Sequence, residues 1–101
     1  MNIYKIYFNH IIEAINSFRS DYDYTFDIKK ILSKLTLEPP KNALNGDMSS
    51  NIAMLLTSEI KLNPNEIANR FKPYILKFPG IKEITIARPG FINITLTQST
   101  W

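Results

Sequence analysis

The fold is decided by residues 84–96, which read ITIARPGFINITL. Apolar and polar residues alternate on both sides of the turn pair Pro89–Gly90, and this pattern predicts two β-strands joined as a hairpin. Alternate residues of a strand share a face, so the core face is expected to carry the aliphatic side chains Ile92, Ile94 and Leu96. Phe91 and Asn93 are then neighbours on the opposite, wetter face.

Three other segments show the apolar spacing of amphipathic helices. Apolar residues recur every three or four positions in residues 3–18, in residues 52–60 and in residues 67–78. Ser49 or Ser50 is expected to cap the second of these helices. The sequence therefore predicts three main helices and a hairpin at the end of the chain.

The third helix has a clear start and a proline inside it. Asn63 can cap the helix, Pro64 suits the first helical position, and Glu66 completes a capping box. Pro73 lacks the amide hydrogen that the helix needs and crowds the preceding turn. A kink or a break is therefore expected near residues 69–72.

Shorter signals lie between the first two helices. Residues 22–28 alternate with period two, which indicates a strand or an extended link. Leu35–Glu38 favours a strand that ends at Pro39–Pro40, because proline lacks the amide that a central strand needs. Residues 41–47 are predicted to form a loop, with Asn45–Gly46 as its turn.

Three lysines follow the alternating segment at helical spacing: Lys29, Lys30 and Lys34. Two interpretations of these lysines remain open. They form a solvated face, or they contact the phosphate groups of a nucleic acid.

Composition restricts the classes of function that this chain can have. It has 101 residues, which indicates one domain, with no cysteine and one histidine. These counts exclude disulfides, histidine- or thiol-based catalytic triads and the common zinc sites. Its three glycines complete no glycine-rich phosphate-binding motif. We therefore expect no catalytic residue, metal or cofactor in this chain.

Charge and hydropathy narrow the possible partners. The net charge is +3 and the pI is about 9.2, an excess that permits RNA binding without demonstrating it. No stretch reaches the roughly 18 consecutive apolar residues of a membrane span. The first residues also lack the features of a signal peptide. A cytoplasmic protein without membrane contact is expected.

The pair Phe91 and Asn93 has a chemistry of its own. An aromatic ring two residues from a carboxamide, on one face of a strand, can stack on an unpaired base while the amide hydrogen-bonds the base edge. Arg88, just before the turn, can add a phosphate contact or a second stacking plane. On the pattern alone, the competing interpretation is that Phe91 is a second-layer core residue.

Two motifs resemble one known family. They are Gly46-Asp47-Met48-Ser49-Ser50-Asn51-Ile52-Ala53-Met54, followed by Asn63-Pro64, and Ile86-Ala87-Arg88-Pro89-Gly90-Phe91-Ile92-Asn93. Together they are similar to the N-terminal domain of arginyl-tRNA synthetases, and Glu38-Pro39-Pro40-Lys41 resembles the segment that precedes the first motif there. Residues 35–97 carry the resemblance, whereas residues 1–34 fit by position and helical character.

The resemblance implies an α+β fold with two layers, in which a small antiparallel sheet of about four strands packs against helices. Residues 1–101 would form a single tRNA-recognition domain that grips the D-loop of tRNA(Arg). Phe91 would stack on a D-loop base, Asn93 would contact that base, and Asp47 and Asn51 would hold the loop-to-helix junction. Arg88 replaces the usual glycine, so it is either strained at positive φ or an added RNA contact.

The resemblance also implies a larger parent protein, an ATP-dependent class I arginine–tRNA ligase. Its catalytic and anticodon-binding domains are absent here, and the end at Trp101 is expected to lie where the linker to the catalytic domain begins. ATP and magnesium would bind the missing part. The expected partners are the D-loop of tRNA(Arg) and the parent catalytic domain, with the chain as a monomer. The alternative is a protein-interaction module of the same fold that does not bind RNA.

Overall fold

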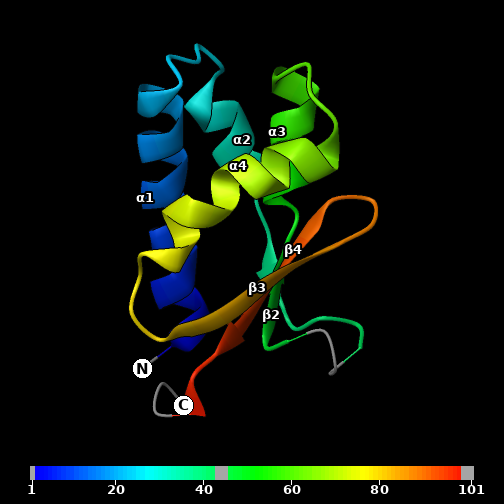
Figure 1. The fold of residues 1–101 in the computed structure, drawn as a ribbon. Coiled ribbons are helices and arrows are strands. Elements are labelled where there is room, and N and C mark those ends of the chain that lie inside the picture. The colour runs from blue at the N-terminus through cyan, green and yellow to red at the C-terminus, as the bar shows by residue number, and fades with distance from the viewer. Residues whose placement is uncertain (1, 43–45, 99–101) are drawn as a thin grey trace.

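The computed structural model describes residues 2–42 and 46–98, which fold as helices packed on an antiparallel sheet. The elements in chain order are α1 (Ile3–Asp21), α2 (Ile28–Lys34), β1 (Leu37–Glu38), β2 (Met48–Ser50), α3 (Ile52–Glu59), α4 (Pro64–Leu76), β3 (Ile81–Ala87) and β4 (Phe91–Leu96). The strand order is β1-β2-β4-β3, with every neighbouring pair antiparallel. The predicted two-layer α+β fold is confirmed (Figure 1).

The core lies between the helices and one face of the sheet. The sheet contributes fully or nearly fully buried aliphatic side chains from three strands: Met48, Ile84, Ile92, Ile94 and Leu96. The core face predicted for β4, with Ile92, Ile94 and Leu96, is therefore confirmed. Figure 1 shows the helices together on one side of the strands, so the other face of the sheet is left without a helical cover.

Helix α1 begins where Asn2 caps it and ends three residues beyond the predicted limit. The Asn2 Oδ1 atom accepts hydrogen bonds from the Tyr4 amide at 3.0 Å and the Lys5 amide at 3.3 Å. The apolar stripe of α1 is buried, at Tyr7, Ile11, Ala14, Ile15 and Phe18. The periodicity thus predicted the helix and the face that it buries.

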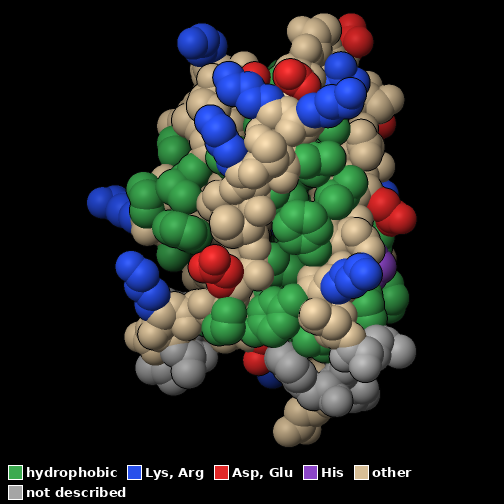
Figure 2. Space-filling view, turned by 180° about the vertical axis from the view of Figure 1, so that it is seen from behind, with side chains coloured by type: hydrophobic (Ala, Val, Ile, Leu, Met, Phe, Trp, Pro, Cys, Tyr) green, Lys and Arg blue, Asp and Glu red, His purple; other side chains and the backbone are tan. Residues whose placement is uncertain are grey.

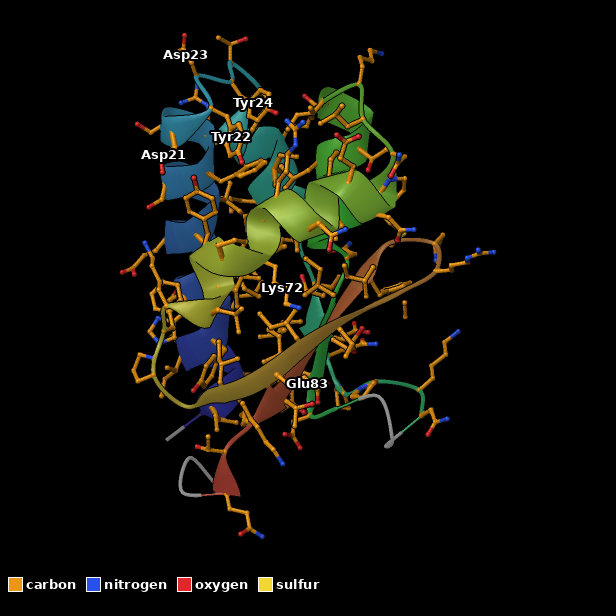
Figure 3. All side chains as sticks on the ribbon, in the orientation of Figure 1. Asp21, Tyr22, Asp23, Tyr24, Lys72 and Glu83 are labelled. Carbon is orange, nitrogen blue, oxygen red and sulfur yellow. The ribbon has the colours of Figure 1, made fainter. Side chains whose placement is uncertain are left out.

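The alternating residues 22–28 form no strand, so that alternative was wrong: Tyr22 and Asp23 lie in a turn, residues 24–27 form a short link, and Ile28 already begins α2. The rings explain the pattern, because Tyr22 and Tyr24 stack on each other at 5.6 Å and both contact Phe18. Figure 3 shows both tyrosines beside Asp21 at the end of α1. The alternation of residues 22–28 therefore reflects rings that pack in one cluster, and it does not reflect a strand of the sheet.

Tyr74 of α4 joins this cluster, and its environment leads to a pH prediction. Its hydroxyl donates a hydrogen bond of 2.7 Å to Asp21, and this bond, with burial and the Asp21 charge, raises the pKa of Tyr74 to about 12. An unfolded tyrosine titrates near 10, so the stabilisation is complete below pH 10 and is lost as the pH rises through about 12.

We therefore expect the free energy of unfolding to fall between about pH 10 and about pH 12. Tyr74→Phe removes the titrating group and should flatten this part of the fall. Urea unfolding of both proteins at several pH values across the window provides the measurement. Parallel curves for the two proteins would contradict the assignment.

Helix α4 starts as predicted and continues where a break was possible. The Asn63 Oδ1 atom accepts from the Glu66 amide at 2.8 Å, but the Glu66 carboxylate pairs with Arg70 at 3.1 Å and does not close a capping box. Pro73 is exposed inside a continuous helix, so the predicted alternative of a break near residues 69–72 was wrong. Figure 1 shows one ribbon that turns downward toward its C-terminal end.

The turn of the hairpin is seated against the helical layer at Gly90. This glycine is buried with φ +150°, and a Cβ atom there would lie 2.9 Å from Met54 Cγ and 3.1 Å from Pro64 Cβ. Only glycine adopts this backbone conformation without strain. Close contact with the starts of α3 and α4 thus fixes the direction in which the hairpin projects.

Gly90→Ala is expected to destabilise the chain by about 1–3 kcal/mol, because the new methyl group adds a steric clash to an unfavourable backbone conformation. Thermal or urea unfolding measures the change. A variant as stable as the parent chain would show that the turn is not seated in this way.

Candidate nucleic-acid interface

The open face of the sheet contains a pocket beside the hairpin turn. Its volume is about 330 Å³, and it lies between the end of β3, the start of β4 and the segment Glu38–Lys41, which begins at the last residue of β1. The hairpin projects to the right in Figure 1 and so lies at the left in Figure 2, where hydrophobic side chains gather with Lys or Arg side chains above and below them. Phe91, Asn93 and Arg88 all line this pocket.

Cross-strand pairing places a row of polar residues on the pocket side of the sheet. Glu38 is the register partner of Ser49, and Ser49 is the partner of Asn93. Neighbouring strands lie about 4.8 Å apart, so the three side chains span roughly 10 Å across the pocket floor. A flat heterocycle fits that width.

Asn93 is the buried member of this row. It is 4% exposed, and its carboxamide makes no hydrogen bond to any residue that the structure describes. The described part of the chain also has no sealed side-chain nitrogen or oxygen left without a partner. The side-chain amide atoms of Asn93 are therefore accessible, and they are reached from the pocket that Asn93 lines. The expectation of a wetter face needs correction here, because pocket walls cover the residue.

Phe91 forms a wall of the same pocket. It is half-buried, pairs with Ala87 across the hairpin, and does not belong to the buried core. Within residues 2–42 and 46–98 its ring stacks on no other aromatic ring. Pro39, Pro40 and Pro89 line the remaining apolar surface. The ring is thus placed beside the open carboxamide and not beneath the helices.

Two positively charged side chains lie at the rim of the pocket. Arg88 and Lys41 are both exposed, and within the described residues neither has a carboxylate within 4.0 Å. Asp23 alone among the described non-glycine residues has a positive φ, so the strain considered for Arg88 does not occur. The Arg88–Pro89 peptide bond is cis. Both side chains are available to an anionic group at the mouth of the pocket.

Asp47 and Asn51 hold distant segments around the pocket together, whereas the resemblance implied that they hold the junction between the loop and the helix; Asn51 stands at the start of α3 but its side chain makes no capping hydrogen bond there. The Asp47 carboxylate accepts from the Leu96 amide at 2.8 Å, which ties the residues before β2 to β4. The Asn51 Oδ1 atom accepts from the Thr36 amide at 2.9 Å, and its Nδ2 atom donates to the Lys34 carbonyl at 3.0 Å. Asn51 therefore bridges the link between α2 and β1, while Ser50 Oγ accepts from the first amide of α3.

Sequence reasoning missed Thr36, Glu38, Lys41 and Ser49 as pocket residues. Glu38 and Ser49 belong to strands of two and three residues, too short for a periodic signal. The predicted strand at Leu35–Glu38 offered one indication, because Thr36 and Glu38 share a face by parity.

Other kinds of site find no support in the part of the chain that the structure describes. No group of three or more metal-ligating side chains comes together there. No helix in those residues combines the length and the apolar character needed to cross a membrane.

The chain is similar to known proteins over nearly its whole length. Residues 5–96 match the model of the arginyl tRNA synthetase N terminal domain. An arginine–tRNA ligase from Azorhizobium caulinodans is 32% identical over 101 residues, which are 100% of this chain and 17% of that protein. An arginine–tRNA ligase from Rickettsia prowazekii is 43% identical over 76 residues, 75% of this chain and 13% of that protein.

The chain therefore spans about a sixth of the length of the curated relatives that it matches. The matched region includes the hairpin, the pocket residues and the Asp47 and Asn51 framework. Because the family model and these relatives match over most of the chain, this chain belongs to the family of arginyl-tRNA synthetase N-terminal domains.

Proposed function

We propose that the chain binds the D-loop at the elbow of tRNA(Arg), with one unstacked base held in the pocket of the open sheet face. The observation that carries this proposal is the meeting of an unstacked ring and an open carboxamide in one cavity with a cationic rim. Aromatic stacking combined with hydrogen bonds to a base edge is the usual means of recognising single-stranded RNA.

Each element of the pocket has a role in this proposal. Phe91 stacks on the base, and Asn93 donates and accepts hydrogen bonds along the base edge. Arg88 and Lys41 contact the phosphates on either side of the bound nucleotide. The polar row at the floor supplies further hydrogen-bonding groups through Ser49 and Glu38.

The parent protein is part of the same proposal. Relatives carrying this domain are arginine–tRNA ligases about six times as long as the chain. We propose that the chain acts within such a class I ligase, in the cytoplasm, as a monomeric docking domain. ATP, magnesium and arginine activation then belong to the catalytic part, which is the second partner of this domain.

The test is a binding titration of the 101-residue chain with a tRNA(Arg) transcript at several salt concentrations. The proposal predicts that log K falls linearly with log salt, by roughly 0.7 for each phosphate contact in a single-stranded region. Replacing the pocket base of the D-loop by an abasic site should weaken binding. If a protein interface explains the pocket instead, no salt-dependent RNA binding should be measured.

Asn93→Ala is expected to abolish discrimination among the four D-loop bases while leaving residual binding. The reason is that stacking on Phe91 tolerates any base, whereas the carboxamide reads the base edge. Affinities for four transcripts that differ at one D-loop position provide the measurement. Asn69→Ala is the matched control, because Asn69 is an exposed residue of α4 outside the pocket. Unchanged discrimination in the Asn93 variant would contradict the role.

A further inference from the structure

Beyond the pocket, four lysines lie on α2 and on the link between α3 and α4. Lys29, Lys30 and Lys34 are exposed on α2, and Lys61 is exposed in the link between α3 and α4. Helix α2 lies behind α4 in Figure 1 and therefore faces the viewer in Figure 2. Lys and Arg side chains gather over the upper part of that view.

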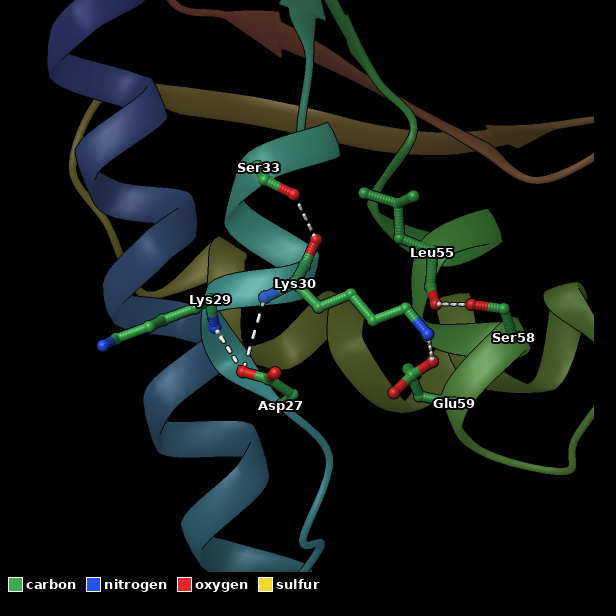
Figure 4. A network of polar contacts seen from close by, with 7 residues as sticks. All are labelled: Asp27, Lys29, Lys30, Ser33, Leu55, Ser58 and Glu59. Atoms are coloured by element: carbon green, nitrogen blue, oxygen red, sulfur yellow. Dashed lines mark hydrogen bonds and ion pairs between the residues drawn. The ribbon is translucent and has the colours of Figure 1, made fainter.

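Two carboxylates near these lysines, those of Asp27 and Glu59, already have hydrogen-bond or ion-pair partners. Asp27 caps α2, because its Oδ1 atom accepts from the Lys29 and Lys30 amides at 3.0 and 3.4 Å. Glu59 of α3 pairs with the Lys30 ammonium at 3.3 Å, as Figure 4 shows. Within the described residues, no carboxylate lies within 4.0 Å of the ammonium groups of Lys29, Lys34 and Lys61.

The Lys30–Glu59 pair has a positioning effect. It joins α2, which carries Lys29 and Lys34, to the last residue of α3, two positions before Lys61. Ile31 on α2 and Leu56 on α3 are both buried in the core, so both helices are also anchored by apolar side chains. The free lysines therefore project from a fixed surface.

The Lys34 end of this surface lies close to the pocket. Asn51 binds the Lys34 carbonyl and the Thr36 amide together, and Thr36 lines the pocket. Two residues of extended chain span at most about 7 Å, so Lys34 lies close to the pocket wall. Arg88 and Lys41 at the rim extend the positive charge to the mouth of the cavity.

We propose that Lys29, Lys34 and Lys61 contact the phosphates of the RNA strand that leaves the pocket. This inference rests on the proposed function, because the pocket fixes where the strand begins. A lysine ammonium is a compact point charge that attracts phosphate without reading sequence. These lysines thus contribute affinity that is independent of the base, whereas the pocket contributes selectivity.

The experiment compares two triple variants of the 101-residue chain that have the same net charge. One carries Lys29→Ala, Lys34→Ala and Lys61→Ala, and Lys30 is kept because it joins α2 to α3. The control carries the same substitution at three exposed lysines outside the α2 side and the pocket lining: Lys5, Lys77 and Lys82. Both are titrated with the tRNA(Arg) transcript and its D-loop base variants at several salt concentrations, beside Phe91→Ala.

The first triple variant should reduce the slope of log K against log salt by about 2, from roughly 0.7 for each of three contacts. It should weaken all base variants by the same factor, whereas the control should keep the parent slope. Equal slopes for the two triples, with binding still sensitive to Phe91→Ala, would overturn the lysine contact and leave the pocket intact. If Phe91→Ala has no effect while the first triple loses affinity, the pocket proposal fails. The lysines then bind RNA phosphates, but the inference that they follow a strand from the pocket is overturned as well.

Discussion

Phe91→Ala is expected to weaken binding of the tRNA(Arg) transcript by about 5- to 150-fold, which corresponds to roughly 1–3 kcal/mol for one stacked base. The ring lines the pocket, and within the described residues it stacks on no other aromatic ring. Removing the ring eliminates the surface on which the bound base would stack. Filter binding or calorimetry at one fixed salt concentration measures the loss.

The stability of the same variant separates the ligand role from a core role. Phe91 is outside the buried core, so thermal unfolding of Phe91→Ala should stay close to that of the parent chain. Phe78→Ala is the matched control for binding, because Phe78 is also half-buried but stacks on His10 at 4.2 Å, outside the pocket. A loss of several kcal/mol in the Phe91 variant, as for a buried phenylalanine, would identify the ring as core.

Phe18→Ala is expected to have the largest effect on stability, a loss of about 3–5 kcal/mol. Phe18 is fully buried in α1, and its ring contacts four others, those of Tyr22, Tyr24, Phe71 and Tyr74. Removing the ring would leave a cavity between α1 and α4. Because domains of this size are stabilised by only about 5–15 kcal/mol, much of the population would unfold on modest heating.

Denaturant unfolding of Phe18→Ala measures this loss, and Phe18→Leu serves as its partner variant. Leucine refills most of the volume, so the Leu variant should lose clearly less than the Ala variant. If both substitutions cost less than about 1 kcal/mol, the ring would not be the centre of the α1–α4 contact.

The hairpin was predictable because its signals are local. Alternation on both sides of Pro89–Gly90 placed Phe91 and Asn93 on one face, and the register of β3 with β4 has that arrangement. The same holds for α1 and for the Asn63 cap, where the pattern and the capping residue lie within a few positions of each other.

The pocket itself was not predictable, because its floor depends on pairing between distant residues. Glu38, Ser49 and Asn93 are brought into one row by the β1–β2 and β2–β4 pairings, and no local pattern encodes such a register. The burial of Asn93 follows from the walls that the chain after β1 adds. The tyrosines after α1 misled for the opposite reason, because tertiary packing of rings produced a period of two without a strand.

An unpaired RNA base is expected to enter the pocket between Phe91 and Asn93. The most direct test is an NMR titration of the isotope-labelled chain with a D-loop stem of tRNA(Arg), read at backbone amides and at the Asn93 side-chain amide. If the base enters there, the largest shifts are expected at Phe91, Asn93 and Ser49, and an abasic D-loop should remove them. Shifts confined to the ring cluster around Tyr22 and Tyr74, with the pocket amides unmoved at saturation, would contradict this expectation.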